Sequence, residues 1–125
     1  MLAFHMFCWP ESMGAVEQSR DRLNNYLRSL ADAASDWIAG TTSADYPGYD
    51  KIIAGLAEET FESQVEKGAA WIGTPSQISE QISEYKKLVG EFEVASLQVN
   101  FHDMPLKLAK SSIKLFSEEV IPRFQ

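Results

Sequence analysis

Three polar side chains and one tryptophan stand where two apolar segments of this chain end. Gln98 and Asn100 alternate with apolar residues in the segment 94–101, His102 follows directly, and Trp9 ends the first apolar run. Side-chain amides donate hydrogen bonds to polar ligand atoms and accept hydrogen bonds from them. A histidine, whose unperturbed pKa is about 6.5, can exchange a proton at neutral pH. If the two segments are strands of a (β/α)8 barrel, these residues lie near the carboxyl ends of the strands, where such barrels bind small molecules. For His102 a second interpretation stays open, that of a solvated loop residue.

The segment before these residues has the pattern of a helix over 75–89. Thr74 is predicted as its N-cap, Pro75 as its first helical residue and Gln77 as the partner in a capping box. Gly90 follows as the residue that ends it. One face is apolar at helical spacing: Ile78, Ile82, Tyr85 and Val89.

The segment 94–101 changes to a period of two, which predicts a strand. Its two faces are apolar (Ala95, Leu97, Val99, Phe101) and polar (Ser96, Gln98, Asn100). In a (β/α)8 barrel the polar face would point inward, toward the active site above the carboxyl ends of the strands. In an antiparallel sheet it would face water at an edge. Periodicity alone leaves both architectures open.

Further motifs resemble a known family. Gly73, Thr74 and Pro75 open the helix, an Asn-Phe pair ends the strand, and the chain closes with the run LFSEEVIPRF at 115–124. This combination resembles the C-terminal end of bacterial luciferase-like flavin-dependent monooxygenases. The resemblance is specific over 68–124 and looser before that.

The resemblance implies an α/β fold, namely the C-terminal portion of a (β/α)8 TIM barrel with two barrel strands and about four helices. It divides the chain into a penultimate strand and helix (1–39), an insertion or lid with a helix (40–67) and a last helix-strand-helix unit (68–125). A complete barrel needs about 250 residues, so 125 residues are expected to be incomplete on their own.

The same resemblance implies a function. The chain would be part of a monooxygenase in which reduced flavin and O2 oxidise a small organic substrate, with FMN, or the deazaflavin F420, as cofactor. Gln98, Asn100, His102 and Trp9 would form one wall of the pocket, and no residue is assigned a catalytic role. The expected partner is a chain carrying the preceding strands, or another copy pairing at the strand edges of 2–9 and 94–101. The alternative is a non-catalytic barrel remnant that serves as an oligomerisation or partner-binding module.

The remaining segments are expected to pack around these elements. The run 2–9 is apolar on both faces, as in a covered parallel strand, and contains His5 and Cys8, which are interpreted as core residues. For His5 a second interpretation stays open, that of a proton carrier facing the lumen of a barrel. Residues 11–39 and 49–67 are predicted helices. The loop 40–48 is either a mobile lid or an anchored surface loop. The last helix is expected to bury a face at helical spacing, Leu106, Ala109, Ile113, Phe116 and Val120.

Composition excludes several classes. The net charge of -7 argues against binding to nucleic acid or to anionic lipid. One cysteine cannot form an internal disulfide, no apolar run is long enough for a membrane span, and two separated histidines do not specify a metal site. We therefore expect a cytoplasmic protein without a metal.

Overall fold

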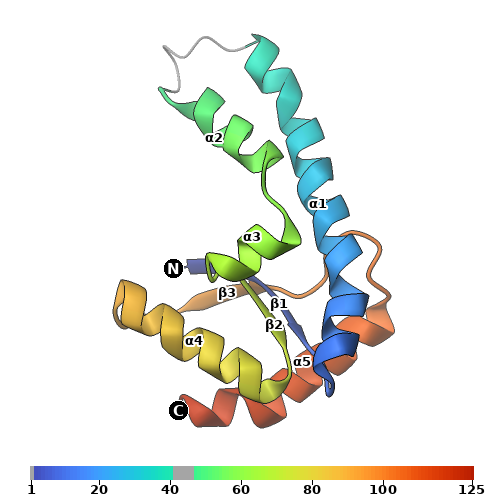
Figure 1. The fold of residues 1–125 in the computed structure, drawn as a ribbon, viewed down its shortest axis with the longest axis vertical. Helices are drawn as coiled ribbons and strands as arrows, with labels where there is room; N and C mark the ends of the chain where they lie inside the picture. The colour runs from blue at the N-terminus through green and yellow to red at the C-terminus, as the bar shows by residue number, and fades with distance from the viewer. Residues whose placement is uncertain (1, 41–46) are drawn as a thin grey trace.

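The computed structural model of the chain describes residues 2–40 and 47–125. Its centre is a parallel sheet of three strands, β1 (Leu2–Cys8), β2 (Ala70–Gly73) and β3 (Ala95–Gln98), in the order β2-β1-β3 (Figure 1). His5 is aligned with Ala70 on one side and with Gln98 on the other. The first strand of the chain is therefore the central one, and the expected open edge at residues 2–9 is wrong.

Helices cover both faces of this sheet. The elements are α1 (Ser12–Gly40), α2 (Tyr49–Ala57), α3 (Phe61–Glu66), α4 (Pro75–Val89), α5 (Leu106–Glu119) and a closing 3-10 turn, Ile121–Arg123. On one face Phe7 and Ile72 pack with Leu23 of α1 and Phe61 of α3. On the other face a second cluster joins the sheet to α4 and α5 (Phe4, Met6, Trp71, Ile78, Ile82, Phe116). Figure 1 shows α2 beside the far half of α1, away from the sheet.

The α/β class is confirmed, but two expectations about the elements are wrong. Within residues 2–40 and 47–125 there are three strands instead of two and five α-helices instead of about four. The missed strand, β2, has four residues and all are buried, so it offers no alternation of apolar and polar residues to detect. A (β/α)8 barrel keeps consecutive strands adjacent and its helices outside, whereas here β3 lies on the far side of β1 from β2. The described sheet does not show the barrel arrangement.

Local helix signals were read correctly around α4. Thr74 and Gln77 form the predicted capping box, and Gly90 follows with a φ of 86°. The predicted helix 49–67, however, is divided into α2 and α3, because Thr60 and Ser63 form a second capping box that starts a new helix. Of the predicted lid, residues 41–46 lie outside the described part of the chain.

The buried face of α5 differs from the predicted one. Ala109, Phe116 and Val120 are buried as expected, but 64% of Leu106 and 42% of Ile113 are exposed. Ser112 is fully buried instead. The face that meets the sheet is therefore rotated about the helix axis relative to the most apolar face. It carries the hydroxyl of Ser112, which accepts a hydrogen bond from the backbone N–H of Cys8 in β1.

Candidate functional site

Gln98, the last residue of β3, faces α1. Its side-chain oxygen accepts a hydrogen bond from the hydroxyl of Tyr26, at 3.1 Å. His5, its neighbour on β1, packs edge-on against the ring of Tyr26 with centroids 5.4 Å apart, and against Phe101 at 5.8 Å. Gln98 is thus covered by α1 and has already used one of its acceptor positions, whereas Ser96, on the same side of the strand, is exposed.

Beyond the strand the alternation of faces ends. Ala95, Leu97 and Val99 contact the cluster under α4 and α5 as predicted, but Phe101 packs into the opposite cluster with α1. The predicted apolar face is therefore wrong at Phe101, because β3 stops at Gln98 and the chain turns. Asn100 is exposed in this turn.

His102 and Asp103 form a polar turn that reaches α1. The Nδ1 of His102 lies 3.2 Å from Oδ1 of Asp103, and the same oxygen lies 3.4 Å from Nε of Arg22. The hydrogen bond from His102, with help from Arg22, holds the pKa of Asp103 below its usual value. The carboxylate is therefore ionised at neutral pH and sits between two basic groups.

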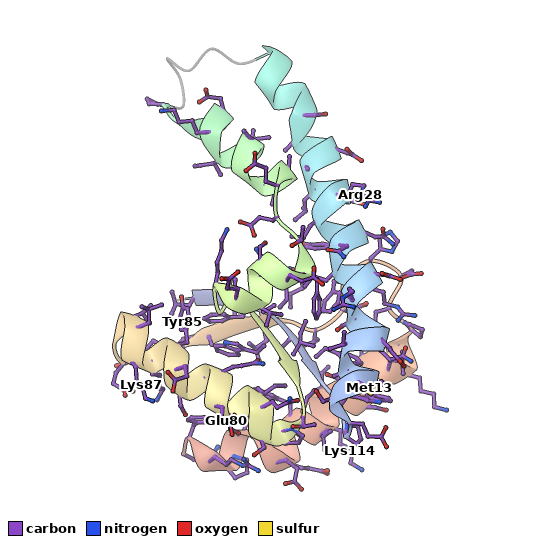
Figure 2. All side chains as sticks on the ribbon, in the orientation of Figure 1. Met13, Arg28, Glu80, Tyr85, Lys87 and Lys114 are labelled. Carbon is purple, nitrogen blue, oxygen red and sulfur yellow. The ribbon has the colours of Figure 1, made fainter. Side chains whose placement is uncertain are left out.

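Trp9 lies in a different environment. Its ring stacks on Phe7 with centroids 5.5 Å apart, and a Cβ at Gly14 would come within 2.8 Å of it, so glycine lets α1 start against the indole. It lines a cavity of about 330 Å³ with residues of α5 and the loop before α1: Pro10, Ser111, Lys114, Leu115 and Glu118. Figure 2 labels Lys114 at this end of the molecule, where α1 begins.

The structure therefore does not gather the four predicted residues into one pocket. His5 is aligned with Gln98, and Trp9 lies four residues farther along the chain than His5. Four residues of a strand span about 13 Å. The cavity at Trp9 contains none of the other three. A smaller cavity of about 200 Å³ is lined by Gln98 with His5 and Ser96, and it contains neither Asn100 nor His102.

Sequence reasoning missed Arg22 and Tyr26, the two residues of α1 that contact the end of β3. The two residues are four apart in the sequence, so they lie on the same side of the predicted helix. That spacing was the signal that they could contact one neighbouring segment together. The interpretation of Cys8 as a core residue agrees with the structure. Its side chain is fully buried, and burial together with Glu119 raises the pKa of the thiol to about 11.

A further cavity of about 620 Å³ lies between α3 and α4, where no predicted site residue is found. Figure 2 shows Glu80 and Tyr85, two of its lining residues, on α4. Within residues 2–40 and 47–125 no three histidine, cysteine or acidic side chains are grouped closely enough to hold a metal ion. Over the same ranges, no helix combines the length and apolar character needed to span a bilayer.

Similarity to known proteins is found among solved structures. No family model matches the sequence, and no curated protein matches it either. The solved structures that are similar over almost the whole chain include two monooxygenases. One is the monooxygenase RslO1 from Streptomyces bottropensis, with 20% identity and a TM-score of 0.60, covering 98% of this chain and 30% of that one.

The other is the oxygenating constituent of 3,6-diketocamphane monooxygenase from the CAM plasmid of Pseudomonas putida, a Type II Baeyer-Villiger monooxygenase in complex with FMN. It has 20% identity and a TM-score of 0.63, covering 97% of this chain and 32% of that one. The fold is that of a portion of these monooxygenases. The resemblance to flavin-dependent monooxygenases is thereby confirmed for the fold, and this chain spans about a third of the length of the structures it matches.

Proposed function

We propose that the chain acts as part of a luciferase-like flavin-dependent monooxygenase and contributes one wall of the flavin and substrate pocket. The observation that supports this is the similarity of 97–98% of the chain to two monooxygenases, one of them in complex with FMN. FMN is the proposed cofactor, with F420 as the alternative. The strands of the sheet are parallel, and Gln98 ends β3 while Trp9, Asn100 and His102 follow the carboxyl ends of β1 and β3, where such sites lie.

The residues present fit one wall of a flavin site and not a complete site. Asn100 and His102 are exposed and offer an amide and an imidazole, whereas Gln98 is already bonded to Tyr26. When bound, reduced flavin supplies the electrons that activate O2, and the protein binds, orients and shields. In this proposal Asn100 hydrogen-bonds the flavin or substrate, and a chain carrying the preceding strands supplies the remaining groups.

The test is flavin affinity after mixing with a chain that carries the preceding strands. Asn100→Leu removes the amide, so the free energy of flavin binding should become less favourable by about 1–3 kcal/mol, because a buried partner group is left unpaired. Asn25→Leu, the same change on α1, serves as the control. Titration of FMN fluorescence measures both values. An unchanged affinity for Asn100→Leu would place this turn outside the site.

A second candidate is a partner-binding module, and the outer edge of β3 favours it. The outer edge of β2 is closed, because the side-chain amide of Gln81 accepts from the N–H of Ile72 and donates to its C=O, both at 3.0 Å. The outer edge of β3 is open. Leu2 donates to Val94, so in a parallel ladder the N–H and C=O groups of Ala95 point away from β1. No described residue hydrogen-bonds to them, and an unpaired edge can accept a further strand.

Proline at position 95 tests this second candidate. Ala95→Pro removes one outward N–H at the first residue of the strand, where proline is tolerated, and leaves the pairing with β1 intact. If a partner strand binds there, light scattering should show a smaller particle for Ala95→Pro than for the wild-type chain or Ala95→Ser. A wild-type chain that stays monomeric and carries flavin would exclude this candidate in favour of the first.

A further inference from the structure

His102 has an unusual backbone conformation. Its φ is 54°, and among the described residues it is the only one other than glycine with a positive φ. Residues with a Cβ rarely adopt this region, and they persist there only when surrounding contacts hold them. The contacts that hold His102 extend from the turn after β3 into α1.

These contacts form a chain of four side chains. Arg22 donates from one terminal nitrogen to the carbonyl oxygen of Gln18 at 2.5 Å and lies 3.3 Å from the side-chain oxygen of the same residue. Its buried Nε makes no hydrogen bond among the described residues and forms an ion pair with Asp103 at 3.4 Å. Asp103 in turn lies 3.2 Å from Nδ1 of His102. The guanidinium is thus fixed by one turn of α1 and directs the carboxylate toward the ring.

This arrangement specifies where the imidazole carries its proton. An ionised carboxylate only accepts hydrogen bonds, so Nδ1 of His102 must donate to it. In the neutral ring the lone pair is then on Nε2, at the end of the ring farther from Asp103. An acidic group orients a histidine in the same way in other proton-transfer sites.

We propose that His102 is a proton-transfer residue of the pocket wall and that Asp103 and Arg22 are positioning residues that act through it. Nε2 accepts the proton of a weakly acidic hydroxyl group, such as a phenol, on a bound small molecule. The O–H bond breaks, its electron pair stays on the oxygen, and the proton forms the N–H bond of an imidazolium, which later returns it to water. Asn100 is exposed two residues earlier in the same turn, and in this proposal it hydrogen-bonds the same molecule. The role in a pocket rests on the proposed function.

The orientation of the ring is tested first, on the chain alone. Long-range proton–nitrogen correlation spectra at pH 8 should show His102 with a protonated Nδ1 and an unprotonated Nε2. Asp103→Ala should abolish this preference and Arg22→Met should weaken it, while the signals of His5 and the backbone stay unchanged. Asp21→Ala, an exposed acid on α1, is the control. A wild-type ring protonated on Nε2, or one indifferent to Asp103→Ala, would overturn the positioning role.

The proton transfer is tested in the assembly with the chain that carries the preceding strands. For a phenolic substrate, His102→Gln and Asp103→Ala should each lower kcat at least tenfold with little change in KM, and Asp103→Glu should recover part of the loss. Equal turnover by wild type and His102→Gln would overturn the proton transfer. An assembly that binds no flavin would instead overturn the proposed function and the transfer with it, whereas the spectra would still decide the positioning role.

Discussion

The backbone N–H of Cys8 donates a hydrogen bond to the hydroxyl oxygen of Ser112, 2.8 Å away and 104 residues later in the chain. The alternate N–H groups of β1 point toward β3, as the bond from Leu2 to Val94 shows. β3 ends opposite His5, so the N–H of Cys8 has no strand to meet. Ser112 of α5 takes the place of the missing strand, and its hydroxyl also contacts the sulfur of Met6 at 3.7 Å.

Ser112→Ala should therefore destabilise the fold by about 1–3 kcal/mol, since a buried N–H would lose its partner. Urea unfolding followed by circular dichroism measures the change. Ser111→Ala is the matched control, because Ser111 is the neighbouring residue of the same helix and is exposed. Equal stability of the two variants would contradict the assigned role of Ser112.

Gln81 should be equally important at the opposite edge of the sheet. Gln81→Leu leaves the N–H and C=O of Ile72 unpaired and opens the edge of β2, so we expect a loss of about 1–3 kcal/mol and a tendency to aggregate. Glu80→Leu, at the exposed neighbouring position, controls for added apolar surface. Hydrogen exchange at the Ile72 amide is the direct measurement, and an unchanged rate in Gln81→Leu would refute the prediction.

His5 should make stability depend on pH. Burial lowers its pKa from 6.5, with a smaller opposing contribution from Gln64, and its Nδ1 is buried without a hydrogen-bond partner among the described residues. The unfolded chain then binds the proton more readily than the folded one. The free energy of unfolding therefore rises with pH between the lowered pKa of the folded state and 6.5, and the contribution of His5 is lost as the pH falls below 6.5. His5→Gln should remove this dependence, and His102→Gln, at an exposed position, should leave it in place.

Glu59 should contribute in a more acidic range. Hydrogen bonds from Lys67, and then from Ser63 and Gln64, lower its pKa from 4.5 to about 2. Its contribution to stability is therefore complete above pH 4.5 and is lost as the pH falls toward 2. Acid unfolding monitored by circular dichroism should show a flatter curve in this range for Glu59→Gln. Glu58→Gln, at the exposed neighbouring position, should behave as wild type.

The features that could be predicted from sequence are those specified by a few neighbouring residues. The capping box of Thr74 and Gln77 and the glycine after α4 depend on local backbone geometry and are where they were expected. The apolar side of β3 was also read correctly as far as Val99, because alternation follows directly from strand geometry.

The features that were missed depend on contacts between distant segments. Nothing near residues 70–73 indicates a strand, because β2 is buried on both faces by elements elsewhere in the chain. The exposed positions of Leu106 and Ile113 follow from the hydrogen bond of Ser112 to β1, which no helical pattern contains. For the candidate site, His102 lies after the strand as predicted, but Asn100 was predicted within the strand and lies in the turn after β3. The contacts of His102 with α1 through Asp103 and Arg22 could not be predicted, because they depend on the packing of α1.

The central position of β1 also determines when the sheet can form during synthesis. β1 leaves the ribosome before both of its neighbours in this sheet, because β2 begins only at residue 70 and β3 only at residue 95. Bringing such distant segments together is slow. Until residue 98 has been made, the apolar side chains of β1 should therefore lack the two strands that flank them here, and they are then available to the chaperones that bind nascent chains.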